Sequence, residues 1–288
     1  MLRSAVLMTI MLFASLCQPA RGDIMGFGDG SAYTLNSIST PAPSINGGTL
    51  TLTTDGGAFQ AASAFYDTRQ STGSFTAAFT YQASGIADGV TFVIQNDPNG
   101  LNALGSLGSG LGYAATGGYT SAIVNSVALE VDFYNFTGGP GTYLGTQGAS
   151  GIFNYLPTLP VNFNDPTQFT ITYDASAQTL SETLVDTISP TTTYAHTFTG
   201  IDLASEVGSS SAYVGFTGGT GGLTSTQTIS NFEFQSAAVP EPGSLTLALV
   251  GIGVTLGVWL TRRNVRQRLG WPRVPQPTCD GVGPRCSR

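Results

Sequence analysis

The chain reads Val127-Ala128-Leu129-Glu130-Val131-Asp132-Phe133-Tyr134 near its middle, and this run has a clear two-residue period. Apolar side chains occupy every second position, and the carboxylates of Glu130 and Asp132 fall together on the opposite face. Successive side chains of a strand point to opposite sides, so this alternation predicts a β-strand with one apolar face. The other face of that strand is expected to carry the two carboxylates.

Short runs rich in β-forming residues recur along the chain between clusters of Gly, Asn, Asp, Pro and Ser. These runs cover residues 33–35, 49–53, 75–81, 90–95, 127–133, 169–173, 212–216 and 229–234. Many short strands separated by turn residues predict an all-β sandwich. The Gly-rich stretches 105–118 and 218–222 each lie between strands, so we expect them to be ordered loops.

The first residues of the chain have the features of an export signal. Residues 1–22 combine an early arginine with an apolar run over 5–16 and with small residues at Ala20 and Gly22. That spacing is typical of a signal-peptidase site. We therefore expect residues 1–22 to be a signal peptide, the mature chain to begin at Asp23, and the protein to be exported.

The other end carries Val239-Pro240-Glu241-Pro242, an uncharged stretch over 243–261, and four arginines that end at Arg268. A helix of nineteen residues spans about 28 Å, close to the roughly 30 Å of a hydrocarbon core, so 243–261 is predicted to be a transmembrane helix. Arginines that flank a span stay on the cytoplasmic side. The C-terminus, with a disordered tail over 269–288, is therefore expected in the cytoplasm.

This order of motifs over residues 239–268 resembles the PEP-CTERM sorting signal of bacterial envelope proteins. The resemblance implies a location in the cell envelope or at the cell surface, in a bacterium that produces exopolysaccharide. It also implies that a sorting transpeptidase acts at the Pro-Glu-Pro motif. Before such processing the chain would be a single-pass membrane protein.

The part of the chain between these segments is strongly acidic. Residues 23–242 hold 16 of the 17 acidic residues against one base, Arg69, which gives a formal charge of −15 where the whole chain has −7. Such a balance argues against nucleic acid or an anionic membrane surface as a partner of this part. It contains no cysteine, so its stability must come from a hydrophobic core, and residues 23–238 are enough for one domain.

Four segments of this domain, taken in order, resemble the signature segments of legume-type (L-type) lectins and their bacterial relatives. They cover residues 87–94, 108–113, 127–134 and 212–221. The resemblance implies a concanavalin-like jelly-roll sandwich of antiparallel sheets. It further implies that a sugar binds beside a calcium ion and a transition-metal ion.

The resemblance also assigns roles to residues of this chain. Asp88 would accept hydrogen bonds from sugar hydroxyls, and the ring of Tyr134 would stack on the apolar face of a pyranose. Backbone N–H groups of the two glycine loops would donate to the sugar. The carbohydrate-binding residues implied in this way are Asp88, Gly110, Tyr134, Asn135, Gly218, Gly219 and Thr220.

The implied metal ligands are Glu130, Asp132, Tyr134 and Asn135, and this set is incomplete. The family adds an Asn four residues after the Asp, then another Asp and a His, but here no Asp, Glu or His occurs over residues 133–164. We therefore expect no transition metal. Two interpretations stay open: one calcium ion is held by these oxygens, with Asp88 helping through water, or Glu130 and Asp132 are solvated carboxylates.

An enzyme of the jelly-roll type is a further alternative, because Glu130-Val131-Asp132 is similar to the start of a laminarinase-like glycoside hydrolase site. Retaining hydrolysis needs a second carboxyl group about 5 Å from the first, and Tyr134 and Asn135 stand where that acid would be. The single histidine, His196, lies in a strand-like stretch, where an exposed or core imidazole is far more common than a catalytic one. We therefore expect no catalysis.

Two hypotheses of function remain. The first is an exported, cell-surface protein that binds a glycan or polysaccharide, and Asp88, Tyr134 and the glycine loops favour it. The second is a structural exopolysaccharide-matrix or adhesion protein whose sugar site is degenerate, and the incomplete metal set favours it. The fold alone does not decide between them.

Overall fold

The computed structural model describes residues 23–132, 134, 141–150 and 159–237, all within the first of two units of the chain, Met1–Ala238. The predicted signal peptide, transmembrane helix, arginine cluster and tail lie outside these residues. Asn135 lies outside them too. Within the described part, no helix has the length and apolar character needed to cross a membrane.

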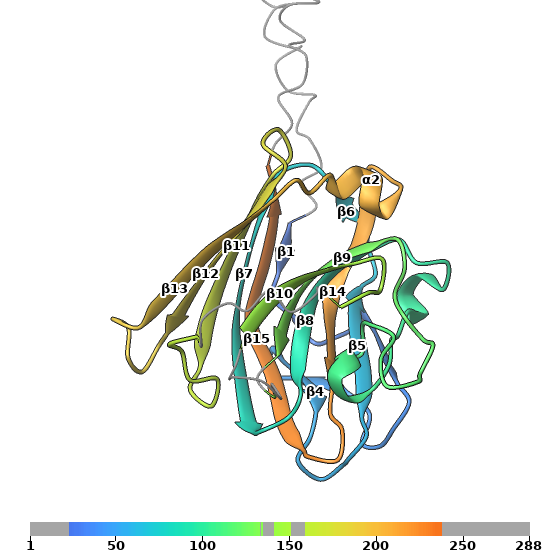
Figure 1. Cartoon of the computed structure of the whole chain (residues 1–288), viewed down its shortest axis with the longest axis vertical. Helices are drawn as coiled ribbons and strands as arrows, with labels where there is room; N and C mark the ends of the chain where they lie inside the picture. Colours follow the sequence, from blue (N-terminus) through green and yellow to red (C-terminus); the bar gives the residue numbers. More distant parts are fainter. Residues whose placement is uncertain (1–22, 133, 135–140, 151–158, 238–288) are drawn as a thin grey trace, which may run out of the picture. The chain divides into compact units, whose positions relative to one another are not determined.

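The described residues form a sandwich of two antiparallel sheets, which confirms the predicted all-β fold (Figure 1). One sheet has eight strands in the order β13-β12-β11-β7-β15-β4-β3, with β1 beside β15. Its strands are β1 (Ile24–Met25), β3 (Ser44–Asn46), β4 (Thr49–Thr53), β7 (Phe75–Gly85), β11 (Thr167–Asp174), β12 (Thr179–Asp186), β13 (Thr193–Thr199) and β15 (Ser225–Ser236).

The second sheet has seven strands in the order β10-β9-β8-β14-β5-β2, with β6 beside β14. Its strands are β2 (Tyr33–Ser37), β5 (Ala61–Tyr66), β6 (Gln70–Ser71), β8 (Gly89–Gln95), β9 (Ser126–Asp132), β10 (Gly141–Thr146) and β14 (Ser211–Gly219). Each of the eight runs predicted from the sequence lies in one of the strands of these two sheets, apart from Phe133, which lies outside the described residues.

Aromatic rings fill the space between the two sheets. Phe79 stacks on Phe169 at a centroid distance of 4.9 Å within the eight-stranded sheet, and it meets Phe216 of the seven-stranded sheet edge-on at 5.0 Å. Leu129 and Val131 of β9 point into this core, as their alternation predicted. Burial of such rings removes a large apolar area from water and provides the main stabilisation in a domain without disulfides.

A second, smaller core lies on the other face of the seven-stranded sheet. There Tyr113 and Ile123, from the segment between β8 and β9, pack with Val93 and Phe65. This segment also contains two short 3-10 helices, η1 (Gly100–Asn102) and η2 (Gly108–Gly110), and it is ordered as predicted. The sheet is therefore covered on both faces over part of its area.

Helical periodicity did not predict the short helix α2 (Leu203–Val207). Its boundaries are fixed by the residues at its two ends. Asp202 accepts a hydrogen bond from the Ser205 N–H at 3.1 Å, and Gly208 follows the helix with a φ of 66°. A side-chain acceptor at the first end and a left-handed glycine at the other are the usual limits of a helix. A helix of five residues is too short to show an apolar period.

Candidate functional site

Two of the predicted carboxylates meet at one end of the seven-stranded sheet. Asp88 directly precedes β8, and Asp132 is the last residue of β9. The strands are antiparallel, and Gly89 lies opposite Asp132. Both carboxylates therefore lie at the same end of the sheet. A Cβ atom at Gly89 would collide with the carbonyl oxygen of Val131, which explains why glycine follows Asp88.

Two backbone hydrogen bonds fix the position of Asp88. Its N–H donates to the Gly219 carbonyl at 3.1 Å, and its carbonyl accepts from the Tyr134 N–H at 3.3 Å. The residue is 5 % exposed, and its Oδ2 atom is buried without a hydrogen-bond partner among the described residues. Burial raises the pKa of Asp88 to about 6, although the Gly221 N–H acts in the opposite direction.

Asp132 has a still more perturbed carboxyl group. Burial, followed by the negative charge of Asp88, raises the pKa of Asp132 to about 8, while the Tyr134 N–H lowers it. Its Oδ1 atom is also buried without a partner. Arg69, the one basic side chain over 23–237, lies instead on the Tyr213 ring, 4.3 Å from its centroid. The described part of the chain therefore supplies no cation to this pair.

Glu130 is buried rather than solvated. It is 2 % exposed, and its Oε2 atom accepts a hydrogen bond from the Ser150 hydroxyl at 2.7 Å. Its Oε1 atom packs so closely on Gly145 of β10 that a Cβ there would collide with it. The interpretation of Glu130 as a solvated carboxylate is therefore wrong, because β10 and the segment around Tyr113 cover this face of the sheet.

The two unpartnered oxygens, Asp88 Oδ2 and Asp132 Oδ1, have the chemistry that a hard cation satisfies. Among the described residues, no three His, Cys, Asp or Glu side chains are grouped as metal ligands. Of the other predicted ligands, Tyr134 is described and Asn135 is not. His196 lies on β13 in the other sheet. The residues present fit one oxygen-ligated ion with an incomplete protein ligand set.

The two glycine loops enclose the Asp88 carboxylate. The Gly108 N–H donates to the Thr220 carbonyl at 3.0 Å, which joins one loop to the other. A Cβ atom would lie 3.4 Å from Asp88 Oδ2 if placed on Gly108, and 3.2 Å if placed on Gly221. Gly108 also has a φ of 62°, which favours glycine. Both positions therefore allow the loops to approach the carboxylate.

Some N–H groups assigned to the sugar by resemblance are used inside the protein. The Gly110 N–H closes a turn of η2 at 3.2 Å, and the Thr220 N–H donates to the Gln60 carbonyl at 2.9 Å. Gly218 and Gly219 are the buried last residues of β14 and not part of a loop. In this arrangement the four residues support the shape of the loops around Asp88.

An exposed aromatic ring, not predicted from the sequence, stands beside these loops. The Phe59 N–H donates to the Gly221 carbonyl at 2.8 Å, and the residue is 57 % exposed. Ile86 and Leu223, each two residues from Asp88 or Gly221 along the chain, are exposed as well. Phe59 follows Gly-Gly-Ala in a turn and has a φ of 55°, so no periodic pattern marks it. Phe59 therefore lies beside the Gly221 and Gly222 segment that approaches the Asp88 carboxylate.

The legume lectin domain model matches residues 24–247 of the chain. No curated protein matches. Among solved structures, a lectin from Bauhinia forficata in complex with GalNAc is similar, with 22 % identity and a TM-score of 0.59 over 76 % of this chain and 99 % of that one. The acidic lectin of winged bean, complexed with methyl-α-D-galactose, has 21 % identity and a TM-score of 0.57 over 75 % and 98 %. Arcelin-5, a lectin-like defence protein from Phaseolus vulgaris, has 20 % and 0.56 over 76 % and 99 %.

Proposed function

The chain belongs to the legume lectin domain family, and from this premise we infer that it binds carbohydrate without catalysing a reaction. The observation that carries the inference is the Asp88 carboxylate, buried under two glycine loops with Oδ2 unpartnered. Two similar lectins are complexed with GalNAc and with methyl-α-D-galactose. A neutral hexose or hexosamine unit of a glycan or polysaccharide is the ligand class we propose.

In this proposal, Asp88 accepts hydrogen bonds from sugar hydroxyls, as an ionised carboxylate does well. Tyr134 and Asn135 contact the sugar on one side, and the backbone shaped by Gly110, Gly218, Gly219 and Thr220 borders the other. Phe59 adds an exposed ring beside Gly221, suited to the C–H face of a pyranose. Carboxylate and ring together would fix both the hydroxyl pattern and the plane of the sugar.

Calcium assists the site in the same proposal. The ion would be held by Asp132, the Tyr134 carbonyl and Asn135, with Asp88 linked through water, and it would supply the positive charge that this carboxylate pair lacks. The support is the pair of buried, unpartnered carboxylate oxygens. Asp88 and Asp132 would then both be ionised, and Asp88 would keep its acceptor character for the sugar.

The absence of catalysis is inferred from the carboxyl groups themselves. Glu130 is bonded to Ser150 and covered by β10, so it has no access to a glycosidic bond. Retaining hydrolysis requires two accessible carboxyl groups about 5 Å apart. A structural matrix or adhesion role is the second candidate, favoured by the use of the Gly110 and Thr220 N–H groups inside the protein.

Location and anchoring are proposed from the sequence alone. Residues 1–22 act as the signal peptide, 23–238 as the exported domain, 239–268 as the PEP-CTERM motif with its membrane helix over 243–261, and 269–288 as the cytoplasmic tail. A sorting transpeptidase then acts at the Pro-Glu-Pro motif. The acidic domain would face a medium that contains polysaccharide.

A glycan array with the purified full chain tests this function. We expect retention of glycans with terminal neutral sugars in calcium and weaker retention in chelator. Asp88→Ala should abolish the calcium-dependent part of this retention by removing the charged acceptor, and Tyr134→Ala should weaken that part, while both variants keep the circular dichroism of a β-sheet protein. If the wild type retains no glycan, the structural-matrix candidate replaces the lectin.

A further inference from the structure

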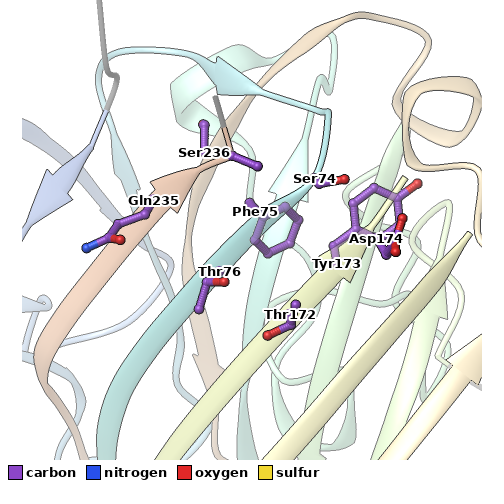
Figure 2. A pocket seen from close by; sticks show the side chains of 9 residues that line it. Ser74, Phe75, Thr76, Thr172, Tyr173, Asp174, Gln235 and Ser236 are labelled. Carbon is purple, nitrogen blue, oxygen red and sulfur yellow. The ribbon is translucent and has the colours of Figure 1, made fainter. Parts of the chain in front are cut away.

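A cavity of about 410 Å³ lies at the end of the eight-stranded sheet that is remote from Asp88 (Figure 2). It is lined by residues 74–76, 172–174 and 235–237, where β7 begins and β11 and β15 end. β7 extends for eleven residues from there to Gly85, three residues before Asp88. At about 3.3 Å per residue this strand is roughly 33 Å long, so the cavity and the Asp88 site lie at opposite ends of it.

Three polar side chains form a row across the cavity. Thr76 of β7 lies opposite Thr172 of β11 on one side and opposite Gln235 of β15 on the other. Neighbouring strands are about 4.8 Å apart, so two hydroxyls and one amide are presented at that interval. All three side chains are exposed, and none makes a hydrogen bond to another described residue. Figure 2 shows them on adjacent strands at the cavity.

Asp174 and Ser74 add further polar groups to the cavity. Asp174 Oδ1 accepts hydrogen bonds from the Ser176 N–H at 2.8 Å and from the Ala177 N–H at 3.1 Å. Hydrogen bonds to the Ser176 side chain and to these N–H groups hold the pKa of Asp174 below its usual value, so the group is ionised and Oδ2 can accept from a ligand. Ser74 Oγ accepts from the Ala175 N–H at 3.0 Å, which leaves its own O–H to donate.

These groups restrict the chemistry of a ligand. Threonine hydroxyls and a glutamine amide both donate and accept, and Asp174 only accepts. None of the described residues that line the cavity is basic, so an anion such as phosphate would meet a carboxylate and no positive charge. The rings of Phe75 and Tyr173 belong to the core, so the cavity has no exposed aromatic wall for an apolar ligand. A neutral polyhydroxylated molecule matches the remaining groups.

We propose that this cavity is a second saccharide-binding site, with Thr76, Thr172, Gln235 and Asp174 as its polar contacts. The inference goes beyond the proposed function, because it concerns residues that are separate from the Asp88 site and does not depend on that site. Two sugar sites at opposite ends of one domain would allow a single chain to bridge two glycan segments. Weak single sites then gain from multivalency on a dense polysaccharide.

The test is a titration of the purified full chain, in mild detergent, with glucose, galactose, mannose and xylose, followed by saturation-transfer NMR. In an Asp88→Ala background we expect sugar binding to persist with a Kd near millimolar, roughly that of an exposed polar site. Adding Thr76→Val and Thr172→Val should weaken it by about fivefold for each lost hydroxyl, the factor of one ordinary hydrogen bond. Valine keeps the branched shape that a strand accepts.

The matched control is Thr170→Val with Thr183→Val, two exposed threonines opposite each other on β11 and β12 of the same face. This pair should leave binding unchanged. The proposal is overturned if Asp88→Ala alone removes all binding, or if the Thr76 and Thr172 substitutions act no more than the control pair. If those two substitutions remove binding that Asp88→Ala leaves intact and unweakened, the cavity stands and the sugar site at Asp88 fails.

Discussion

Gly89 lies directly opposite Asp132 in the antiparallel pair of β8 and β9, and the Val131 carbonyl leaves no room for a side chain on it. Gly89→Ala should therefore separate the strands at this end and destabilise the domain by about 1–3 kcal/mol, the usual cost of overpacking. Urea unfolding measures the loss. Gly56→Ala is the control, since its nearest atom would be Thr54 Oγ1 at 3.9 Å. Equal unfolding midpoints for the two variants would contradict the account.

Calcium should stabilise the folded chain if it neutralises the Asp88 and Asp132 pair. The expected gain follows RT ln(1 + [L]/Kd), about 2.7 kcal/mol at a hundredfold excess over Kd, and chelator should reverse it. Asp132→Asn keeps the shape of the side chain but removes its charge, so the thermal shift with calcium should disappear. Asp67→Asn, an exposed carboxylate bonded to Thr34 at 2.8 Å, should keep the shift.

A melting temperature that ignores both millimolar calcium and chelator would separate the two parts of the proposal. Sugar binding by Asp88 would then proceed without a metal, and Asp132 would be a protonated buried carboxyl near neutral pH, consistent with its pKa of about 8. Differential scanning fluorimetry over a calcium titration provides the measurement.

Phe59 gives a prediction about affinity without a change in stability. Its side chain is exposed, so Phe59→Ala should leave the unfolding midpoint nearly unchanged. Loss of a stacking ring should weaken sugar binding by about 0.5–1.5 kcal/mol, or about twofold to tenfold. Ile188→Ala, at an exposed residue between β12 and β13, is the matched control. If Phe59→Ala binds sugar as tightly as the wild type, the Phe59 ring does not contact the sugar.

Alternation of apolar and polar side chains is one of the signals that predict strands in this sequence. The β9 run was recognised because Leu129 and Val131 share one face, and they lie in the core. In contrast, β5 has the sequence Ala-Ala-Ser-Ala-Phe-Tyr and is buried on both faces, so its period is hidden. β12 carries Glu182 on its inward face between Leu180 and Leu184, which breaks the apolar alternation.

The site could be predicted in part for a similar reason. The sequence predicts that Asp88 and Asp132 lie at one end of the sheet, because Asp88 precedes one predicted strand and Asp132 lies near the end of another. The burial of Glu130 depends on its contacts with β10 and Ser150. No local pattern of the sequence predicts these contacts. The use of the Thr220 N–H depends on Gln60, 160 residues away along the chain. Long-range pairings of this kind decide which predicted groups remain available to a ligand.

The proposed membrane orientation can be tested through Cys279 and Cys286, the two cysteines that follow the uncharged stretch over 243–261. An impermeant thiol reagent should not label them in intact cells and should label them after permeabilisation, because the flanking arginines keep that end in the cytoplasm. Protease added outside should digest the acidic domain under the same conditions. Labelling in intact cells would reverse the proposed orientation.

Glu182 connects the two sheets through a buried hydrogen bond. It is 1 % exposed, its Oε1 atom accepts from the Thr142 hydroxyl of β10 at 2.5 Å, and its Oε2 atom has no partner among the described residues. Burial raises its pKa to about 7, and the Thr142 hydroxyl offsets part of the rise. Tyr194 of β13 is a titratable neighbour, and burial, followed by the charge of Glu182, raises the pKa of that phenol.

The stability of the domain should therefore fall as the pH rises through the range set by Glu182. Its folded pKa of about 7 lies above the ordinary value of 4.5, so the folded state binds the proton more tightly. The resulting stabilisation is complete below pH 4.5 and is lost by about pH 7, a difference of roughly 3 kcal/mol. In Glu182→Gln the neutral amide removes this contribution, so urea unfolding at pH 4.5, 6 and 7.5 should show the wild type losing that much relative to the variant. Glu233→Gln, a control on the exposed face of β15, should show the same pH dependence of unfolding as the wild type. If Glu182→Gln also has the pH profile of the wild type, Glu182 is not a protonated buried carboxyl group.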